Sequence, residues 1–267
     1  MQLNSMGRTL LNWSLSLLLL LSSWGVSSSA IAAEALGDRM DNSPPAITGP
    51  AAESALDLFR DAYEHRYTWN IDFPGYQAEV SVRYEGQLYH GLVHVKPDLT
   101  TDVINIENRD VAQLVDSQLQ MSITHLKRVP FAERHQQHQF ERVGEDETGA
   151  TEIQQLGDDS DSHYKVKDQE IKQVNRVLGD VAVKVDTLGS IRTPEGYLPT
   201  RFQVTFKDVQ TGEVLEQDDV RDFYEKIGSY YLLTNREIRF GLEEGPRLKP
   251  LPDVTVRFDS VQPLPII

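Results

Sequence analysis

The sequence contains no cysteine, and this absence removes several classes of protein at once. Without thiols the chain has no disulfides, iron–sulfur ligands, thiolate zinc sites, cysteine nucleophile or lipid-modified cysteine of a bacterial lipoprotein. Positive charge is also scarce, because 26 Lys+Arg face 41 Asp+Glu and the net charge is −15. This balance disfavours a nucleic-acid partner, since phosphate binding needs basic side chains to replace counterions.

Recognised catalytic signatures are missing as well. The sequence has no G-x-S-x-G elbow, P-loop, G-x-G-x-x-G or H-E-x-x-H. The acidic groups 158–161 and Asp218/Asp219 fall in turns or point to opposite sides of a strand, so surface charge is the favoured interpretation for both. No catalytic residue and no cofactor is therefore predicted, and the chain is not expected to be an enzyme.

The long apolar run lies at the N-terminus and is typical of an export signal. Arg8 precedes the apolar residues 10–26, and the small residues Ala30-Ile31-Ala32 follow them. We expect cleavage after Ala32, so that residues 1–32 are a signal peptide and no transmembrane segment remains. The alternative, an uncleaved anchor, is disfavoured because serines dilute the run and no basic stop-transfer cluster follows. The expected location is the periplasm or the thylakoid lumen.

The exported part is predicted to contain a flexible leader at 33–49, one domain at 50–260 and a C-terminal tail at 261–267. Apolar residues at three- and four-residue steps predict helices over about 51–66 and 109–125. Elsewhere apolar and polar residues alternate, which predicts ten or eleven strands joined by short turns and hence paired antiparallel. These strands are expected at about 76–84, 88–95, 138–144, 150–156, 163–168, 171–178, 181–188, 198–208, 213–224, 229–240 and 253–259.

This pattern predicts an α+β fold with one large, strongly curved antiparallel sheet, half-barrel-like, and two helices on its concave face. A sheet of that width has to curl or split, and an interior that stays partly unfilled can take an apolar ligand. The candidate ligand-binding residues lie on the two helices, on a central strand and at the aromatic helix-to-strand junction. For the aromatic residues at the junction, a purely structural role is the competing interpretation. The candidate residues are Phe59, Tyr63, Trp69, Leu114, Leu119, Phe202, Val204 and Phe206.

Two pairs of histidines also suggest a metal site. His135 and His138 form an H-x-x-H pair, and His90 and His94 share one face of a predicted strand. A zinc site needs three or four converging ligands, and neither pair has a third at diagnostic spacing. No metal is predicted, and His135 and His138 remain weak candidates.

A dense aromatic signature opens the predicted domain. It consists of Leu58-Phe59, Ala62-Tyr63-Glu64, Arg66-Tyr67-Thr68-Trp69 and Phe73-Pro74-Gly75-Tyr76. This signature resembles that of an uncharacterised family of exported cyanobacterial and plastid proteins, known only as a domain of unknown function, and the likeness runs from about Ala52 to Phe258. It implies no reaction, cofactor or catalytic residue. The expected architecture is distantly similar to that of periplasmic lipoprotein carriers and related lipid-binding proteins.

Three hypotheses about function follow. The favoured one is an exported soluble carrier or sensor that binds a lipid, an acylated protein or a pigment in the concave face of the sheet. The alternative is a ligand-free module that meets a protein partner outside the cytoplasm. A metal-dependent hydrolase is the third, and it rests on the histidine pairs alone.

Overall fold

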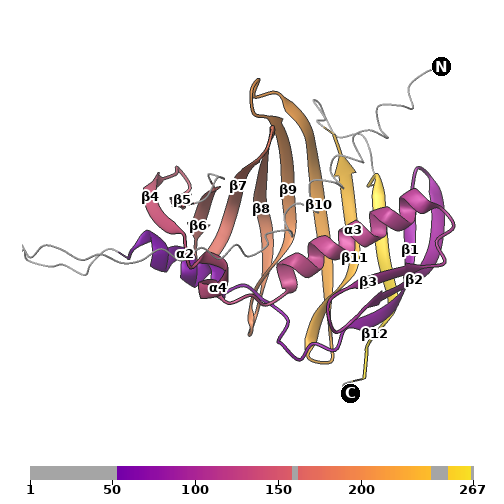
Figure 1. The fold of residues 1–267 in the computed structure, drawn as a ribbon. Coiled ribbons are helices and arrows are strands. Elements are labelled where there is room, and N and C mark those ends of the chain that lie inside the picture. The colour runs from indigo at the N-terminus through magenta and orange to yellow at the C-terminus, as the bar shows by residue number, and fades with distance from the viewer. Residues whose placement is uncertain (1–52, 158–161, 242–251, 266–267) are drawn as a thin grey trace, which may run out of the picture.

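The structure is a computed structural model that describes residues 53–157, 162–241 and 252–265 (Figure 1). The predicted signal peptide at 1–32 and the leader at 33–49 lie outside the described residues.

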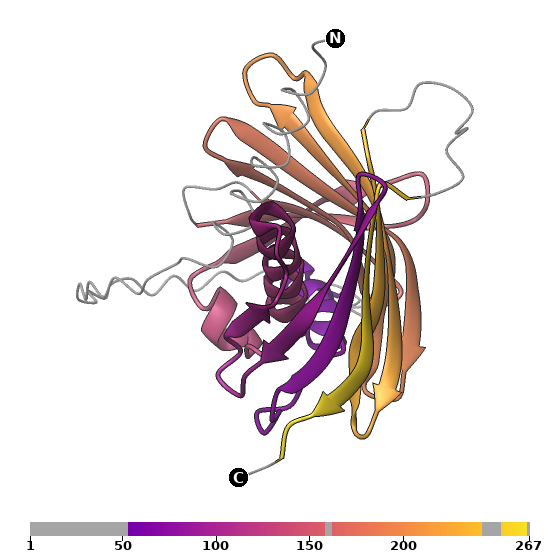
Figure 2. The same cartoon turned by 90° about the vertical axis from the view of Figure 1, so that its right-hand side faces the viewer.

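The described residues form one antiparallel sheet of twelve strands in the order β3-β2-β1-β12-β11-β10-β9-β8-β7-β6-β5-β4. Its strands are β1 Tyr76–Tyr84, β2 Gln87–Val95, β3 Thr101–Ile104, β4 Gln139–Glu145, β5 Thr151–Leu156, β6 Ser162–Lys167, β7 Glu170–Leu178, β8 Val181–Thr193, β9 Gly196–Asp208, β10 Val214–Ile227, β11 Tyr230–Phe240 and β12 Val254–Pro263. The helices are α2 Ala55–Glu64, α3 Arg109–Leu126 and α4 Phe131–His135. All three lie on the same side of the sheet (Figure 2).

The order of the strands follows the chain except at one place. From β4 to β11 each strand pairs with the next through a short connection, as alternating segments separated by turns predict. The last strand, β12, instead enters between β11 and β1 and joins the N-terminal hairpin to the rest. The ends of the sheet, β3 and β4, do not meet, so the sheet is open.

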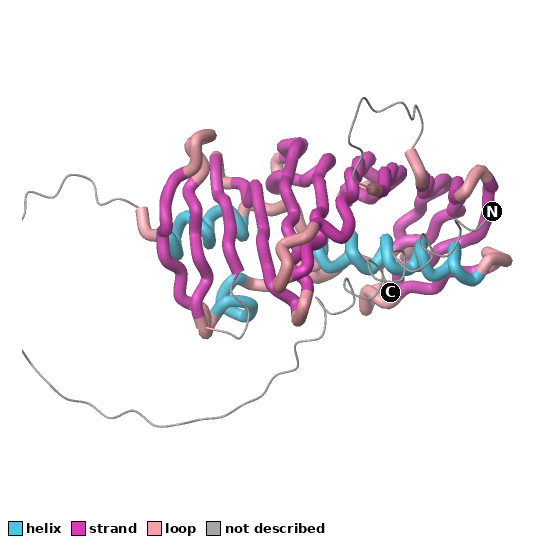
Figure 3. The backbone as a smooth tube through the Cα atoms, turned by 90° about the horizontal axis from the view of Figure 1, so that it is seen from above, coloured by secondary structure: helices cyan, strands magenta, loops and turns pink. Residues whose placement is uncertain are grey.

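Two details of the predicted fold are corrected. The sheet has twelve strands rather than about ten, because β3 spans only Thr101–Ile104 and is too short for alternation to reveal it. The predicted strong, half-barrel-like curvature is wrong, and the large antiparallel sheet itself is confirmed. The helices cover two separate parts of the face, so among the described residues no single central element lies where the strands could wrap around it (Figure 3).

The helices begin where polar side chains cap them. Asn108 accepts hydrogen bonds from the backbone N–H groups of Asp110 (2.9 Å) and Val111 (3.2 Å), which confirms the predicted start of α3. Ser54 caps α2 by accepting from the N–H of Asp57 at 3.1 Å, so this helix begins later than the predicted residue 51.

Two hydrophobic cores lie between the helices and the sheet. The α3 core joins α3 to β1, β2 and β10–β12, and Val82, Val115 and Val256 are fully buried in it. The α2 core joins α2 and α4 to β5 and β6 around Phe59 and Ile153. The strands between them, β7–β9, are covered less completely by these helices.

A buried ion pair ties α3 to the sheet. Arg236 on β11 donates from Nε and Nη2 to the two carboxylate oxygens of Asp222 on β10, at 2.6 and 2.5 Å. Its Nη1 donates to the side-chain oxygen of Gln118 on α3 at 3.0 Å. Both charged side chains are 2% exposed. The bidentate geometry and the contact with Gln118 satisfy a charge that is otherwise costly to bury.

Candidate functional site

A band of half-buried apolar side chains crosses β7, β8 and β9 on the helix side of the sheet. The register places Val185 directly between Val174 and Val204, so these side chains point to one face. The central band consists of Val174, Val183, Val185, Phe202 and Val204, which are all partly exposed. It connects the two cores, because Val174 packs against the α2 core and Phe202 against the α3 core.

The structure separates the candidate ligand-binding residues of the first helix and the aromatic junction. Phe59 is 1% exposed in the α2 core, and the Tyr63 hydroxyl beside it donates to the backbone oxygen of Val129 at 3.0 Å. Trp69 lies in the other core, where its ring stacks on Phe73 with centroids 4.0 Å apart. These three side chains fill two different interiors.

The remaining candidates divide between α3 and β9. Leu114 and Leu119 are 2% and 1% exposed and pack α3 onto the sheet. Phe202, Val204 and Phe206 share the helix-side face of β9, and the first two belong to the central band. Sequence reasoning missed the valines of β7 and β8, because only the strand register shows that they share this face.

Two carboxyl groups border the band on β10. The register places Glu216 beside Phe206 and Asp218 beside Val204. Burial and, after it, repulsion from the neighbouring Glu216 together raise the pKa of Asp218 to about 8, so near neutral pH the two groups share a proton. The interpretation of Asp218 as surface charge is wrong, since this residue is 7% exposed.

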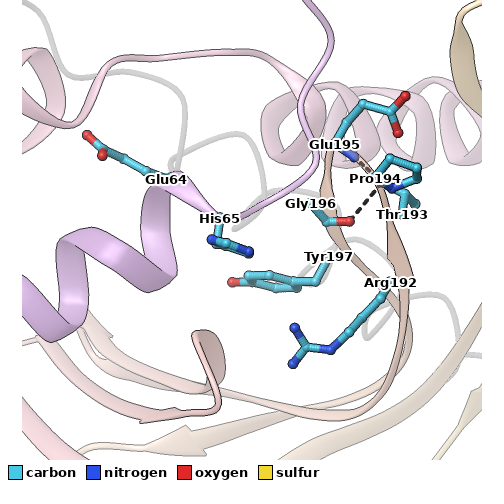
Figure 4. A pocket seen from close by; sticks show the side chains of 8 residues that line it. All are labelled: Glu64, His65, Arg192, Thr193, Pro194, Glu195, Gly196 and Tyr197. Carbon is cyan, nitrogen blue, oxygen red and sulfur yellow. Dashed lines mark hydrogen bonds between the residues drawn. The ribbon is translucent and has the colours of Figure 1, made fainter.

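A small cavity of about 180 Å³ lies where the chain after α2 crosses the start of β9 (Figure 4). It is lined by Glu64, His65, Arg192, Thr193, Pro194, Glu195, Gly196 and Tyr197. Glycine is required at position 196, where φ is +139° and a Cβ atom would lie 2.4 Å from the backbone oxygen of His65. The cavity is polar and smaller than the pockets that hold most organic ligands, so it does not fit the apolar ligand that is expected from the sequence.

His135 and His138 come together, as their spacing suggests, through a hydrogen bond of 3.1 Å between their Nδ1 atoms. Burial and, after it, the adjacent His138 together lower the pKa of His135 to about 3. The aromatic rings of Phe59, Tyr63 and Phe131 surround this imidazole. In the part of the chain that the structure describes, no three His, Asp or Glu side chains are grouped to hold a metal ion.

Across the same described ranges, none of the helices has the length and apolarity that a membrane-spanning helix needs.

Comparisons with known proteins identify a family but no function. No curated protein matches the chain. The solved structure titled "Crystal structure of MucB" covers 81% of this chain and 100% of its own, with 12% identity and a TM-score of 0.24. Residues 51–251 match a family described as "Protein of unknown function (DUF3386)". Because this match spans well over half of the chain, the protein belongs to the DUF3386 family, an uncharacterised family as the aromatic signature predicts.

Proposed function

We propose that this protein is an exported binding module that holds an apolar ligand against the central band. The observation that carries the proposal is the partial exposure of five apolar side chains on the face where the helices bury most others. The band spans three adjacent strands, so its backbone is held by sheet hydrogen bonds on both sides.

A ligand that contacts the band gains free energy in proportion to the apolar area that it covers. Burial of apolar surface contributes about 25 cal/mol per Å², so a ligand that covers about 200 Å² gains about 5 kcal/mol before ordering costs. A free energy of that size corresponds to exchangeable rather than permanent binding, which suits a carrier or a sensor.

Substitution of Val185 by glutamine is expected to weaken binding of a neutral apolar probe at least fivefold, because it places an amide at the centre of the band. Fluorescence titration with N-phenyl-1-naphthylamine measures the affinity. The matched control is Lys184→Gln, which introduces the same side chain one residue away on the opposite face. Lys184 pairs with the partly exposed Asp186, and a partly exposed pair of this kind contributes little to stability.

Equal affinity in V185Q and the wild-type protein would contradict the proposal. Thermal unfolding of both variants verifies that they fold, and Val183→Gln replaces V185Q if the latter does not. Mass spectrometry of organic extracts from natively purified protein then identifies what the band carries in the cell.

The export part of the proposal has its own test. Expressed in an exporting bacterium, the full chain is expected to yield a mature protein that begins at Ala33, because Ala30-Ile31-Ala32 provides the small residues that signal peptidase requires. N-terminal sequencing of the periplasmic fraction checks this. Recovery of the chain with Met1 intact would show that the apolar run is retained.

An interaction module is the second candidate function, and exposed apolar side chains at one end of the sheet favour it. Leu88, Leu92 and Ile104 are 60%, 38% and 36% exposed on β2 and β3, and the register pairs Leu92 with Ile104. Exposed apolar side chains that gather in this way are typical of protein contacts. A stably co-purifying protein together with empty organic extracts would favour this function over ligand binding.

A further inference from the structure

A continuous row of side chains leads from β10 across the central band. Asp218 on β10 pairs in register with Val204 on β9. In the same row, Val185 on β8 lies between Val204 and Val174 on β7. Directly paired residues on neighbouring strands point to the same face, so all four side chains lie on the helix side. The row spans three strand spacings, or about 14 Å, with an acid at one end and valines along the rest.

The acid end of this row differs from the other buried carboxyl groups. Four carboxyl side chains are buried among the described residues: Glu170, Glu216, Asp218 and Asp222. Glu170 and Asp222 each form ion pairs with basic side chains. Glu216 and Asp218 share a hydrogen bond with each other, and within the described ranges neither forms an ion pair with a cation. We call these two residues the carboxyl pair.

One oxygen atom of Asp218 has no hydrogen-bond partner among the described residues. This atom, Oδ1, is buried, and the side chain as a whole is 7% exposed. A buried acceptor without a donor costs stability, and nearly all such atoms in folded proteins are paired. Val204, the next residue in the row, is partly exposed, so a ligand that lies on the band comes next to Asp218. Such a ligand can supply the missing donor.

The charge at the carboxyl pair favours a cation. Near neutral pH the two groups hold one proton between them, so one negative charge remains. Asp219 and Asp253 add to the negative potential at Asp218. A metal ion does not fit, because no three His, Asp or Glu side chains in the described parts of the chain are grouped to hold one. The cation that suits this site is therefore an organic one with hydrogen-bond donors.

We propose that the ligand of the central band is an amphiphile with a primary ammonium head, which the carboxyl pair binds while the apolar chain lies over the valines of the row. This inference rests on the proposed function and names its ligand class. An ammonium group has one positive charge and three N–H donors, so it balances the charge of the pair and donates to Oδ1 of Asp218. An alcohol supplies a donor without the charge, and a quaternary ammonium supplies the charge without a donor.

The same negative charges separate two sources of a primary ammonium. In a phosphoethanolamine lipid the ammonium is joined to a phosphodiester, whose negative charge would lie close to the carboxyl pair. Because like charges repel strongly in a partly desolvated site, we expect the ligand to be a simple amine.

Competition binding against N-phenyl-1-naphthylamine near neutral pH tests the head group with probes that share a dodecyl chain and are kept below their critical micelle concentrations. The probes are dodecylamine, dodecanol, dodecyltrimethylammonium and dodecylphosphoethanolamine. The wild-type protein is expected to bind dodecylamine at least tenfold more tightly than each of the others. The double variant E216Q/D218N is expected to lose this preference and to bind dodecanol as the wild-type protein does.

The matched control is Asp186→Asn, which removes one carboxylate from β8 on the opposite face of the sheet, behind Val185. It is expected to leave the preference for dodecylamine unchanged. If D186N lowers the preference as much as E216Q/D218N does, the amine is attracted by the acidic chain in general, and the assignment to the carboxyl pair is overturned.

The other outcomes separate this inference from the proposed function. Equal binding of dodecylamine and dodecanol to the wild-type protein, or equal weakening of both by E216Q/D218N, overturns the ammonium head and leaves the apolar site intact. Binding of dodecyltrimethylammonium or dodecylphosphoethanolamine as tight as that of dodecylamine overturns the simple primary amine. Binding of neither dodecylamine nor dodecanol overturns the proposed function itself. If the double variant does not fold, D218N alone provides the same decision.

Discussion

Replacement of Arg236 by alanine is expected to lower the free energy of unfolding by about 3–5 kcal/mol, because it leaves the Asp222 carboxylate buried without its partner. Both side chains are 2% exposed, so water does not replace the lost hydrogen bonds at 2.6 and 2.5 Å. Gln118 on α3 loses a charged donor at the same time. Urea unfolding followed by circular dichroism measures the change.

The control for this prediction is Arg257→Ala. Arg257 pairs with Asp259 in an exposed position on β12, the strand next to β11, and an exposed pair of this kind contributes about 0–1 kcal/mol. The double variant R236M/D222L removes both charges together, and we expect it to recover most of the stability that R236A loses. A loss below about 1 kcal/mol in R236A would show that the pair does not stabilise the contact between α3 and the sheet.

The second large effect is the pH dependence that Asp218 imposes on stability. The folded-state pKa of Asp218 is about 8, and its ordinary value is 3.8, so between these values the folded chain binds more protons than the unfolded chain. The contribution of Asp218 to the free energy of unfolding therefore falls as the pH rises from about 4 to about 8. Burial is the main cause, followed by repulsion from Glu216.

Substitution of Asp218 by asparagine is expected to remove this dependence and to stabilise the protein at pH 8 by a few kcal/mol. Asparagine keeps the shape of the side chain and can donate a hydrogen bond to Glu216. Urea unfolding at several pH values between 5 and 8, with the exposed Asp259→Asn as control, measures the difference. Parallel pH profiles of D218N and the wild-type protein would mean that Asp218 is ionised in the folded state without cost.

Local patterns in the sequence were sufficient for most of the secondary structure. Alternation of apolar and polar residues predicted the long strands, and apolar residues at three- and four-residue steps predicted α3. The two elements that the patterns missed, β3 and α4, have four and five residues, which is less than the length over which a period becomes visible.

The candidate site was less predictable. Phe202 and Val204 were identified because they alternate on a recognisable strand, and the structure places them on the central band. Phe59 and Leu114 have the same apolar character, yet the structure packs them into separate cores. The hydrophobicity of a side chain predicts that it is buried, but it does not specify which other side chains it packs against.

The sequence by itself therefore determined the antiparallel character of the sheet, the major helices and the family, because each depends on residues that are close along the chain. Only the tertiary structure decided the insertion of β12 between β1 and β11, the pairing of Arg236 with Asp222, and the position of Asp218 beside Val204 of the band. These features depend on strand order and register, which bring side chains that are distant in sequence onto one face. No local period carries that information.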